Sequence, residues 1–224
     1  PMTDEFNRAD VYNNGIMINL RSGESRILLS SGRPLNDWGI SDSIARAPYR
    51  KYADEDSRTI DITEGKWSLS FTEEAPRVKQ RYKLNRLQTW ESLGDSAAVT
   101  MGTGVYTTSF KLSAEDSRRN WQIDLGDVRE SARVYINDIY VGCAWAVPFV
   151  LDCKNALRKG RNTIRIEVTN LPANRIADME RRGIKWRKMK EINMVDINYK
   201  KTTYENWAPV ASGLNGSVIL REIK

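Results

Sequence analysis

The sequence predicts an all-β protein, built as an antiparallel β-sandwich. Residues 101–170 consist of short runs rich in β-branched and aromatic residues, separated by turn residues, a pattern typical of sandwiches. Over residues 164–168 apolar and polar residues alternate, which predicts a strand with one apolar and one solvated face. Asn137-Asp138 lies between two such runs, and this dipeptide suits the positive φ angles of a two-residue hairpin loop. Together these observations favour a sandwich.

The first 57 residues differ in character from the rest. Residues 16–20 and 26–29 are expected to be two strands joined by a polar turn. Residues 30–57 are rich in Gly, Pro, Asp, Arg and Tyr with little periodicity, and so long an irregular segment is unusual inside a compact domain. We therefore expect residues 1–57 to be an N-terminal extension, the end of a preceding β domain plus a connector. Residues 58–224 then form the sandwich domain.

Further strands are predicted along the sandwich domain by apolar alternation between turn residues. A helical turn is expected at residues 155–160, where Gly160 suits a left-handed cap, and one or two short helices at residues 176–194, over an edge of the sheets. Trp67, Trp90 and Trp121 lie in strand-like contexts and are expected in the core. The predicted strands are residues 59–63, 65–71, 105–110, 121–125 and 218–223.

The residue types present exclude several catalytic chemistries. The chain has no histidine, which rules out Ser-His-Asp and Cys-His mechanisms and histidine-ligated zinc. Cys143 and Cys153 are too few for a disulfide framework; a bridge across a hairpin and buried free thiols both remain open. A carboxylate pair survives as hydrolytic chemistry, but 29 acidic residues make some close pair unavoidable. No βα alternation builds a barrel to present such a pair, so we expect no catalytic residue.

Three tryptophans outside the predicted core are candidate sugar-binding residues. A pyranose offers an apolar face to an aromatic ring and hydroxyl groups to nearby polar side chains. Trp145 follows the predicted hairpin, Trp186 lies among basic residues, and Trp207 precedes a proline in a loop. For each of them, packing in the core or against another domain is the alternative.

Most of the net charge of +6 is carried by residues 175–201, with nine basic and four acidic residues. Such a cluster can attract a polyanion, or it can be a solvated or docking face. No aromatic-interleaved RNA motif or helix-turn-helix accompanies it, so an anion- or nucleic-acid-binding β module is kept only as an alternative. No run approaches the roughly 18 apolar residues of a membrane span, so no membrane partner is expected.

Several motifs resemble known glycoside hydrolase domains. Residues 134–142 (VYINDIYVG), followed by Pro148-Phe149, resemble the sugar-binding jelly-roll domain of family 2 glycoside hydrolases. Three other segments are similar to the C-terminal end of family 106 α-L-rhamnosidases, and the resemblance covers roughly residues 60–224. The three segments are residues 102–110 (GTGVYTTSF), 170–178 (NLPANRIAD) and 212–218 (SGLNGSV).

The resemblance implies a jelly-roll sandwich like a galactose-binding domain. It implies a non-catalytic module that binds carbohydrate or braces a separate catalytic barrel, in a secreted glycoside hydrolase resembling α-L-rhamnosidases and acting on plant-type polysaccharide. A periplasmic or extracellular location follows from the same likeness. A stand-alone lectin-like sugar binder is the first alternative.

The resemblance also implies site residues. Asn137 stands where the family 2 domain carries the Asn of a turn that reaches toward the barrel's active site, so it is a candidate substrate contact; its alternative is a turn-forming role. Related jelly rolls often hold calcium on their rim, and calcium takes six to eight oxygen ligands. The candidate ligands are Asn170, Asn174, Asp178 and Asp196, with Asn198 nearby; ordinary loop capping is the alternative. No other cofactor is expected.

Overall fold

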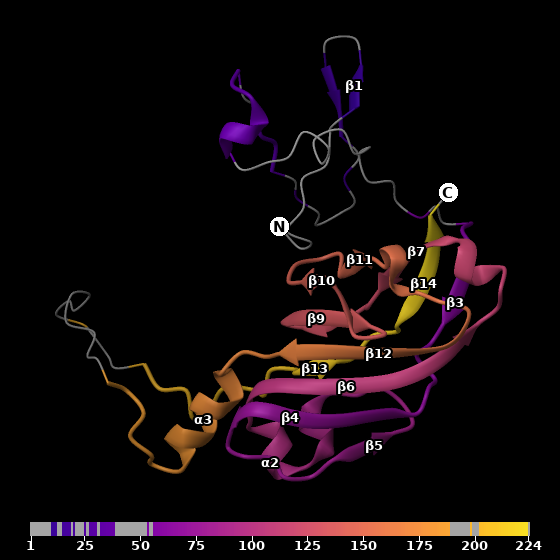
Figure 1. Cartoon of the computed structure of the whole chain (residues 1–224). Helices are drawn as coiled ribbons and strands as arrows, with labels where there is room; N and C mark the ends of the chain where they lie inside the picture. The colour runs from indigo at the N-terminus through magenta and orange to yellow at the C-terminus, as the bar shows by residue number, and fades with distance from the viewer. Residues whose placement is uncertain are drawn as a thin grey trace.

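The structure, a computed structural model, describes residues 56–188 and 202–223, together with Ala53, Asn198 and short pieces between residues 10 and 38. Two antiparallel sheets form a sandwich (Figure 1). The six-stranded sheet has the order β10-β9-β12-β6-β4-β5, and the four-stranded sheet has the order β11-β7-β14-β3. Fold class and jelly-roll-like sandwich architecture are as the sequence predicts.

The strands of the two sheets interleave along the chain, so each sheet is assembled from distant segments. Those of the six-stranded sheet are β4 (Trp67–Ala75), β5 (Tyr82–Leu84), β6 (Met101–Leu112), β9 (Ser131–Ile136), β10 (Ile139–Ala144) and β12 (Gly160–Thr169). Those of the four-stranded sheet are β3 (Thr59–Asp61), β7 (Asn120–Asp124), β11 (Val150–Asp152) and β14 (Ile219–Ile223).

Smaller elements connect and cover the sheets. A two-stranded ladder joins β8 (Val128–Arg129) to β13 (Gly213–Leu214), and a second joins β1 (Asp10–Tyr12) to β2 (Gly15–Met17). The α-helices are α2 (Asp95–Ala98) and α3 (Ala173–Arg181). The 3-10 turns are η1 (Leu35–Trp38), η2 (Trp90–Leu93), η3 (Asp116–Arg118) and η4 (Lys154–Ala156).

One hydrophobic core lies between the sheets, because its buried residues come from both of them. On β12 every second residue is buried, as the alternation over residues 164–168 predicts. Trp67, Trp90 and Trp121 are each at most 1% exposed, which confirms their predicted place in the core.

The predicted hairpin at Asn137-Asp138 is confirmed. These residues join β9 to β10 with φ angles of 51° and 64°, the left-handed values of a type I′ loop. The predicted helical turn before Gly160 is present as η4, and Gly160 itself has a φ of 82°. The predicted helices over residues 176–194 are found in part as α3, after which Gly183 has a φ of 66°; residues 189–194 lie outside the described part.

The prediction for the N-terminal strands is wrong in its pairing. Gly15–Met17 forms a strand, but its partner is Asp10–Tyr12, with Tyr12 opposite Gly15. Residues 27–30 have no regular structure, and Ile27 is 81% exposed. A stable strand needs a neighbouring strand and a surface to pack on. The described residues supply residues 27–29 with neither, and the sequence of this segment alone could not reveal that.

Two further predictions concern cysteines and membranes. Cys143 is half-buried and Cys153 is buried, and they form no disulfide, so of the two possibilities the bridge is absent. Within the described residues no helix has both the length and the apolar character that crossing a membrane requires.

Candidate functional site

An aromatic hollow lies where helix α3 meets the segment that follows residue 202. It has a volume of about 260 Å³. Helix α3, which supplies part of its lining, lies beyond the end of β12 and beside the start of β6 (Figure 1). The lining of the hollow is made of aliphatic and aromatic side chains. The lining residues are Leu171, Pro172, Ala173, Ile176, Trp186, Tyr204 and Trp207.

Tyr204 joins two of the predicted sugar-binding tryptophans. Its ring centroid lies 4.5 Å from that of Trp207, edge to face at 75°, and 5.9 Å from that of Trp186. Trp207 remains 49% exposed. The sequence analysis missed Tyr204, although its position three residues before Trp207 is a signal that could have found it.

A carboxylate and a guanidinium hold these rings in place. Glu180 on α3 accepts hydrogen bonds from Trp186 Nε1 (3.3 Å) and from the backbone N–H of Tyr204. Arg187 donates to Glu180 (3.4 Å), and its guanidinium carbon lies 5.1 Å from the Trp186 ring and 5.2 Å from the Tyr204 ring. Such cation–π contacts order both partners, so the hollow is pre-formed.

Two asparagines fix the hollow to the sandwich. Asn174 on α3 donates to the carbonyl of Val210 (2.7 Å) and accepts from its N–H (2.8 Å). Asn170 accepts from the N–H of Gly102 (3.0 Å) and donates to the hydroxyl of Ser212 (3.1 Å). The three segments that carry the rhamnosidase resemblance therefore meet at one end of the six-stranded sheet.

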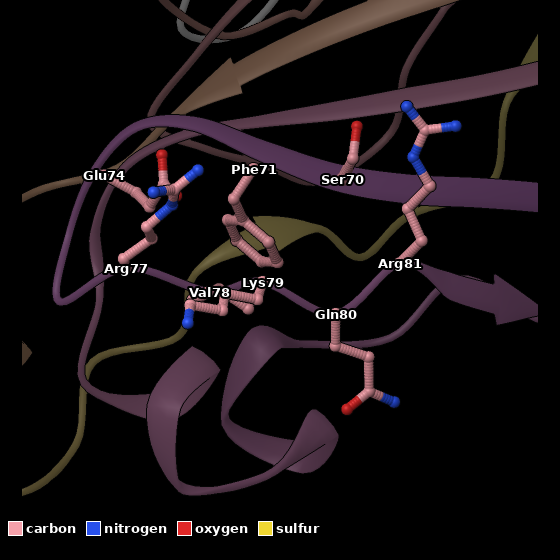
Figure 2. A pocket seen from close by; sticks show the side chains of 8 residues that line it. All are labelled: Ser70, Phe71, Glu74, Arg77, Val78, Lys79, Gln80 and Arg81. Atoms are coloured by element: carbon pink, nitrogen blue, oxygen red, sulfur yellow. The ribbon is translucent and has the colours of Figure 1, made fainter.

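A second hollow, of about 440 Å³, lies between β4 and residues 77–81. Figure 2 shows Arg77, Lys79 and Arg81 at its rim and Phe71 in its wall. Glu74 is its single lining carboxylate, and the aromatic hollow has none. Neither hollow therefore offers the two facing carboxyl groups that glycoside hydrolysis needs.

Comparison with known proteins decides the family. Residues 93–212, more than half of the chain, match the model of the family described as "Glycosyl hydrolase 2 galactose-binding domain-like". The chain belongs to this family. Its domain is thus a galactose-binding-like sandwich of glycosyl hydrolase 2 type, as the hairpin motif at residues 134–142 indicates.

Individual relatives are much longer than this galactose-binding-like chain. It is 28% identical over 173 residues to a protein of Formosa agariphila named "Putative beta-glucuronidase", a match that covers 69% of this chain and 15% of that one. A solved rhamnosidase from Novosphingobium sp. PP1Y is 28% identical, with a TM-score of 0.61 over 80% of this chain and 17% of that one. A β-D-glucuronidase from Dictyoglomus thermophilum shares the fold, at 17% identity and a TM-score of 0.51 over 77% of this chain and 29% of its own.

Three of the four predicted calcium ligands make other contacts within the domain. The side-chain oxygens of Asn170 and Asn174 each accept a backbone N–H, and Asp178 pairs with Arg175 (3.0 Å) and Arg182 (3.5 Å). Asp196 lies outside the described residues. Among those that are described, no three His, Cys, Asp or Glu side chains are grouped to hold a metal. The contacts of the three described residues therefore correspond to loop capping, and the calcium site stays a prediction.

The side chain of Asn137 forms its hydrogen bonds within the domain. Its Nδ2 donates to the carbonyl of Ala156 and to Asn162 Oδ1, both at 2.8 Å, and its Oδ1 accepts from the N–H of Thr163 (3.1 Å). These contacts tie the β9–β10 hairpin to the start of β12. They favour the turn-forming role over the substrate contact that the resemblance implies.

Trp145 is not brought to the aromatic hollow. It follows β10, is 51% exposed, and lies beside Val147, which is 54% exposed. Of the four predicted sugar-binding residues, the structure therefore brings together Trp186 and Trp207 but neither Asn137 nor Trp145.

Proposed function

We propose that the chain is a non-catalytic carbohydrate-binding module of a glycoside hydrolase that resembles α-L-rhamnosidases and acts on plant-type polysaccharide. The observation that carries the proposal is the pre-formed hollow in which Trp186, Tyr204 and Trp207 converge. Support for a rhamnosidase parent comes from the 28% identity to the Novosphingobium enzyme and from the three motifs that meet beside the hollow.

The chemistry of the hollow suits a sugar ring. The half-exposed face of Trp207 can stack on the apolar side of a pyranose. Glu180 and Arg187 are hydrogen-bonded behind the rings and hold them in position. Leu171 and Ile176 add aliphatic surface to a hollow that is mainly apolar.

The basic segment is less suited to a polyanion than its composition indicates. Arg175 and Arg182 pair with Asp178, and Arg187 pairs with Glu180. Within the described residues these cations are therefore committed to stabilising α3 and the aromatic hollow. The nucleic-acid alternative has no comparable support.

A bracing role is a second candidate, on a different surface. Trp145 and Val147 are both more than half exposed, and such side chains next to one another favour an apolar contact with another domain. In the bracing role, the partner is the catalytic barrel of the parent enzyme, in a periplasmic or extracellular setting. The two roles are compatible, since they use different faces.

A glycan array with rhamnose-bearing plant polysaccharides, probed at two salt concentrations with and without calcium, tests the proposal. We expect salt-insensitive binding to one glycan class that Trp207→Ala weakens at least about tenfold, the effect of losing a stacked ring and roughly 1.4 kcal/mol or more. Trp145→Ala, which removes an equally exposed ring outside the hollow, is the matched control. If no glycan on the array binds, the binding role is refuted and the bracing role is left. Equal losses in both variants would refute the aromatic hollow as the binding site.

A further inference from the structure

The second hollow has a composition that the proposed function does not use. Strand β4 forms one wall through Ser70 and Phe71, and the extended residues 77–81 form the other. Figure 2 shows the side chains of Arg77 and Arg81 rising from that segment toward β4, on either side of the Phe71 ring. The hollow is thus open, cationic at its rim and aromatic at its centre.

Its cations have no partners in the described structure. Arg77, Lys79 and Arg81 are exposed, and none of them forms an ion pair with a described residue, in contrast to the arginines of α3. Glu74 is the one lining acid and is likewise outside any such pair. Three like charges around one concavity repel one another, and an anion placed among them relieves that repulsion.

The aromatic wall is rigid. Phe71 packs edge to face on Trp90, with ring centroids 4.8 Å apart and planes at 77°, and on Tyr82 at 6.2 Å and 82°. Trp90 is fully buried, so the Phe71 ring is held from behind. A fixed ring between two guanidinium groups matches a ligand that has both an apolar face and a negative charge.

We propose that this hollow binds an acidic sugar residue, one that carries a carboxylate or a sulfate ester. The inference rests on the proposed function, since it assumes that the ligand of the module is a glycan. Guanidinium groups bind both oxyanions through paired hydrogen bonds, and Lys79 adds a point charge. Phe71 supplies the apolar surface on which the C–H face of the sugar ring packs.

The position of the hollow favours a glycan over a nucleic acid. A phosphate backbone presents charge along its whole length and is bound by an extended basic track, whereas these three cations surround a single hollow. The aromatic hollow also lies close by. A Cβ atom on Gly102 would be 2.7 Å from the Cα of Glu74, and the N–H of Gly102 donates to Asn170, the residue before Leu171. One chain can therefore be expected to reach both hollows.

Isothermal titration of the 224-residue chain with paired probes tests this site. The pairs are trigalacturonate with its methyl ester, and a sulfated dextran fragment with unmodified dextran; single-stranded DNA is the rival polyanion. Arg77→Gln combined with Arg81→Gln removes two cations of the hollow. The matched control, Arg133→Gln with Arg161→Gln, removes two exposed cations of β9 and β12 that do not line it.

We expect at least one acidic probe to bind about tenfold more tightly than its uncharged partner, with that margin lost in the first double variant and kept in the second. Which probe binds decides between carboxylate and sulfate. Equal losses in both double variants, DNA binding with the same dependence on Arg77 and Arg81, or no binding of either acidic probe would each overturn the inference. The glycan-array test with Trp207→Ala is independent of this titration. A negative titration result would therefore leave the proposal for the aromatic hollow unchanged.

Discussion

At the residue scale, the hydroxyl of Tyr106 on β6 is the centre of a hydrogen-bonded group in the core. Tyr106 is 0% exposed, and its hydroxyl accepts hydrogen bonds from Trp90 Nε1 (2.7 Å) and from the N–H of Leu214 (3.1 Å). Gly213 has a φ of 99°, and a Cβ there would lie 2.5 Å from Trp90 Nε1. Position 213 requires glycine because its φ is positive and because a Cβ atom would overlap Trp90. One hydroxyl thus joins β6, η2 and β13.

Replacing Tyr106 by Phe is expected to lower the free energy of unfolding by about 2 kcal/mol. The ring still fills the core, but two buried donors lose their acceptor, and each unsatisfied group costs roughly 1–3 kcal/mol before relaxation. Denaturant titration measures the change. Tyr135→Phe is the control, because Tyr135 is only half-buried and lies under the guanidinium of Arg165; it should change stability by less than about 0.5 kcal/mol. Similar losses in both variants would contradict the role of the Tyr106 hydroxyl.

The same hydroxyl predicts a loss of stability at alkaline pH. Burial raises the pKa of Tyr106 from 10.0 to about 12. Below pH 10 the hydroxyl is protonated in both the folded and the unfolded state, and it contributes fully to the free energy of unfolding. Between pH 10 and 12 only the unfolded state releases the proton, so the free energy of unfolding falls. The difference in unfolding free energy between the wild type and Tyr106→Phe should therefore shrink by about 1.4 kcal/mol per pH unit above pH 10. A difference that stays constant to pH 11 would contradict this.

At the element scale, the β9–β10 hairpin is stabilised by the side chain of Asn137 as well as by its backbone. Asn137→Gly keeps the positive φ but loses three hydrogen bonds to residues 156–163, so we expect a loss of about 1–3 kcal/mol. Asp138→Gly relieves a φ of 64° and should be neutral within about 0.5 kcal/mol or slightly stabilising. Thermal unfolding measures both. If Asn137→Gly folds with unchanged stability but loses glycan binding, the substrate contact implied by the family resemblance is correct instead.

Elements were predictable from sequence where the signal is local. The alternation on β12 and the Asn137-Asp138 dipeptide act through strand geometry and allowed φ angles, so both features were found. Alternation predicts a strand but does not name its neighbour, which is why Gly15–Met17 was assigned the wrong partner although Asp10–Tyr12 lies close by in the chain. The aromatic hollow was found only in part because its contacts join segments that are distant in the sequence. Trp186 and Trp207 meet because Glu180 accepts hydrogen bonds from both Trp186 and the backbone of Tyr204, a contact that no spacing in the sequence displays.

At the scale of the whole molecule, we expect the sandwich to fold without the N-terminal extension. Every residue of the main core cluster lies between Ile62 and Leu220. Ala53 and Ser57 are nonetheless buried, and Arg58 pairs with Asp116 at 2.8 Å. A chain that starts at Ala53 should therefore unfold in a single cooperative transition with its glycan binding intact. If that chain fails to fold, the expectation that the sandwich folds independently of residues 1–52 is wrong.

The two hollows at one end of the six-stranded sheet predict that long acidic glycans bind more tightly than short ones. A chain that occupies both sites makes its second contact at a high effective concentration, so avidity can exceed either affinity by tenfold or more. The test is a ladder of fragments, from dimers to about ten sugars, cut from an acidic polysaccharide that binds on the array. We expect affinity to rise at one fragment length, where a single chain first spans Trp207 and Arg77. Either Trp207→Ala or the Arg77→Gln, Arg81→Gln double variant should abolish the rise and leave the affinity of a short fragment for the remaining hollow. Affinity independent of length in the wild type would show that the hollows act separately, because occupancy of both by one chain cannot occur without this gain.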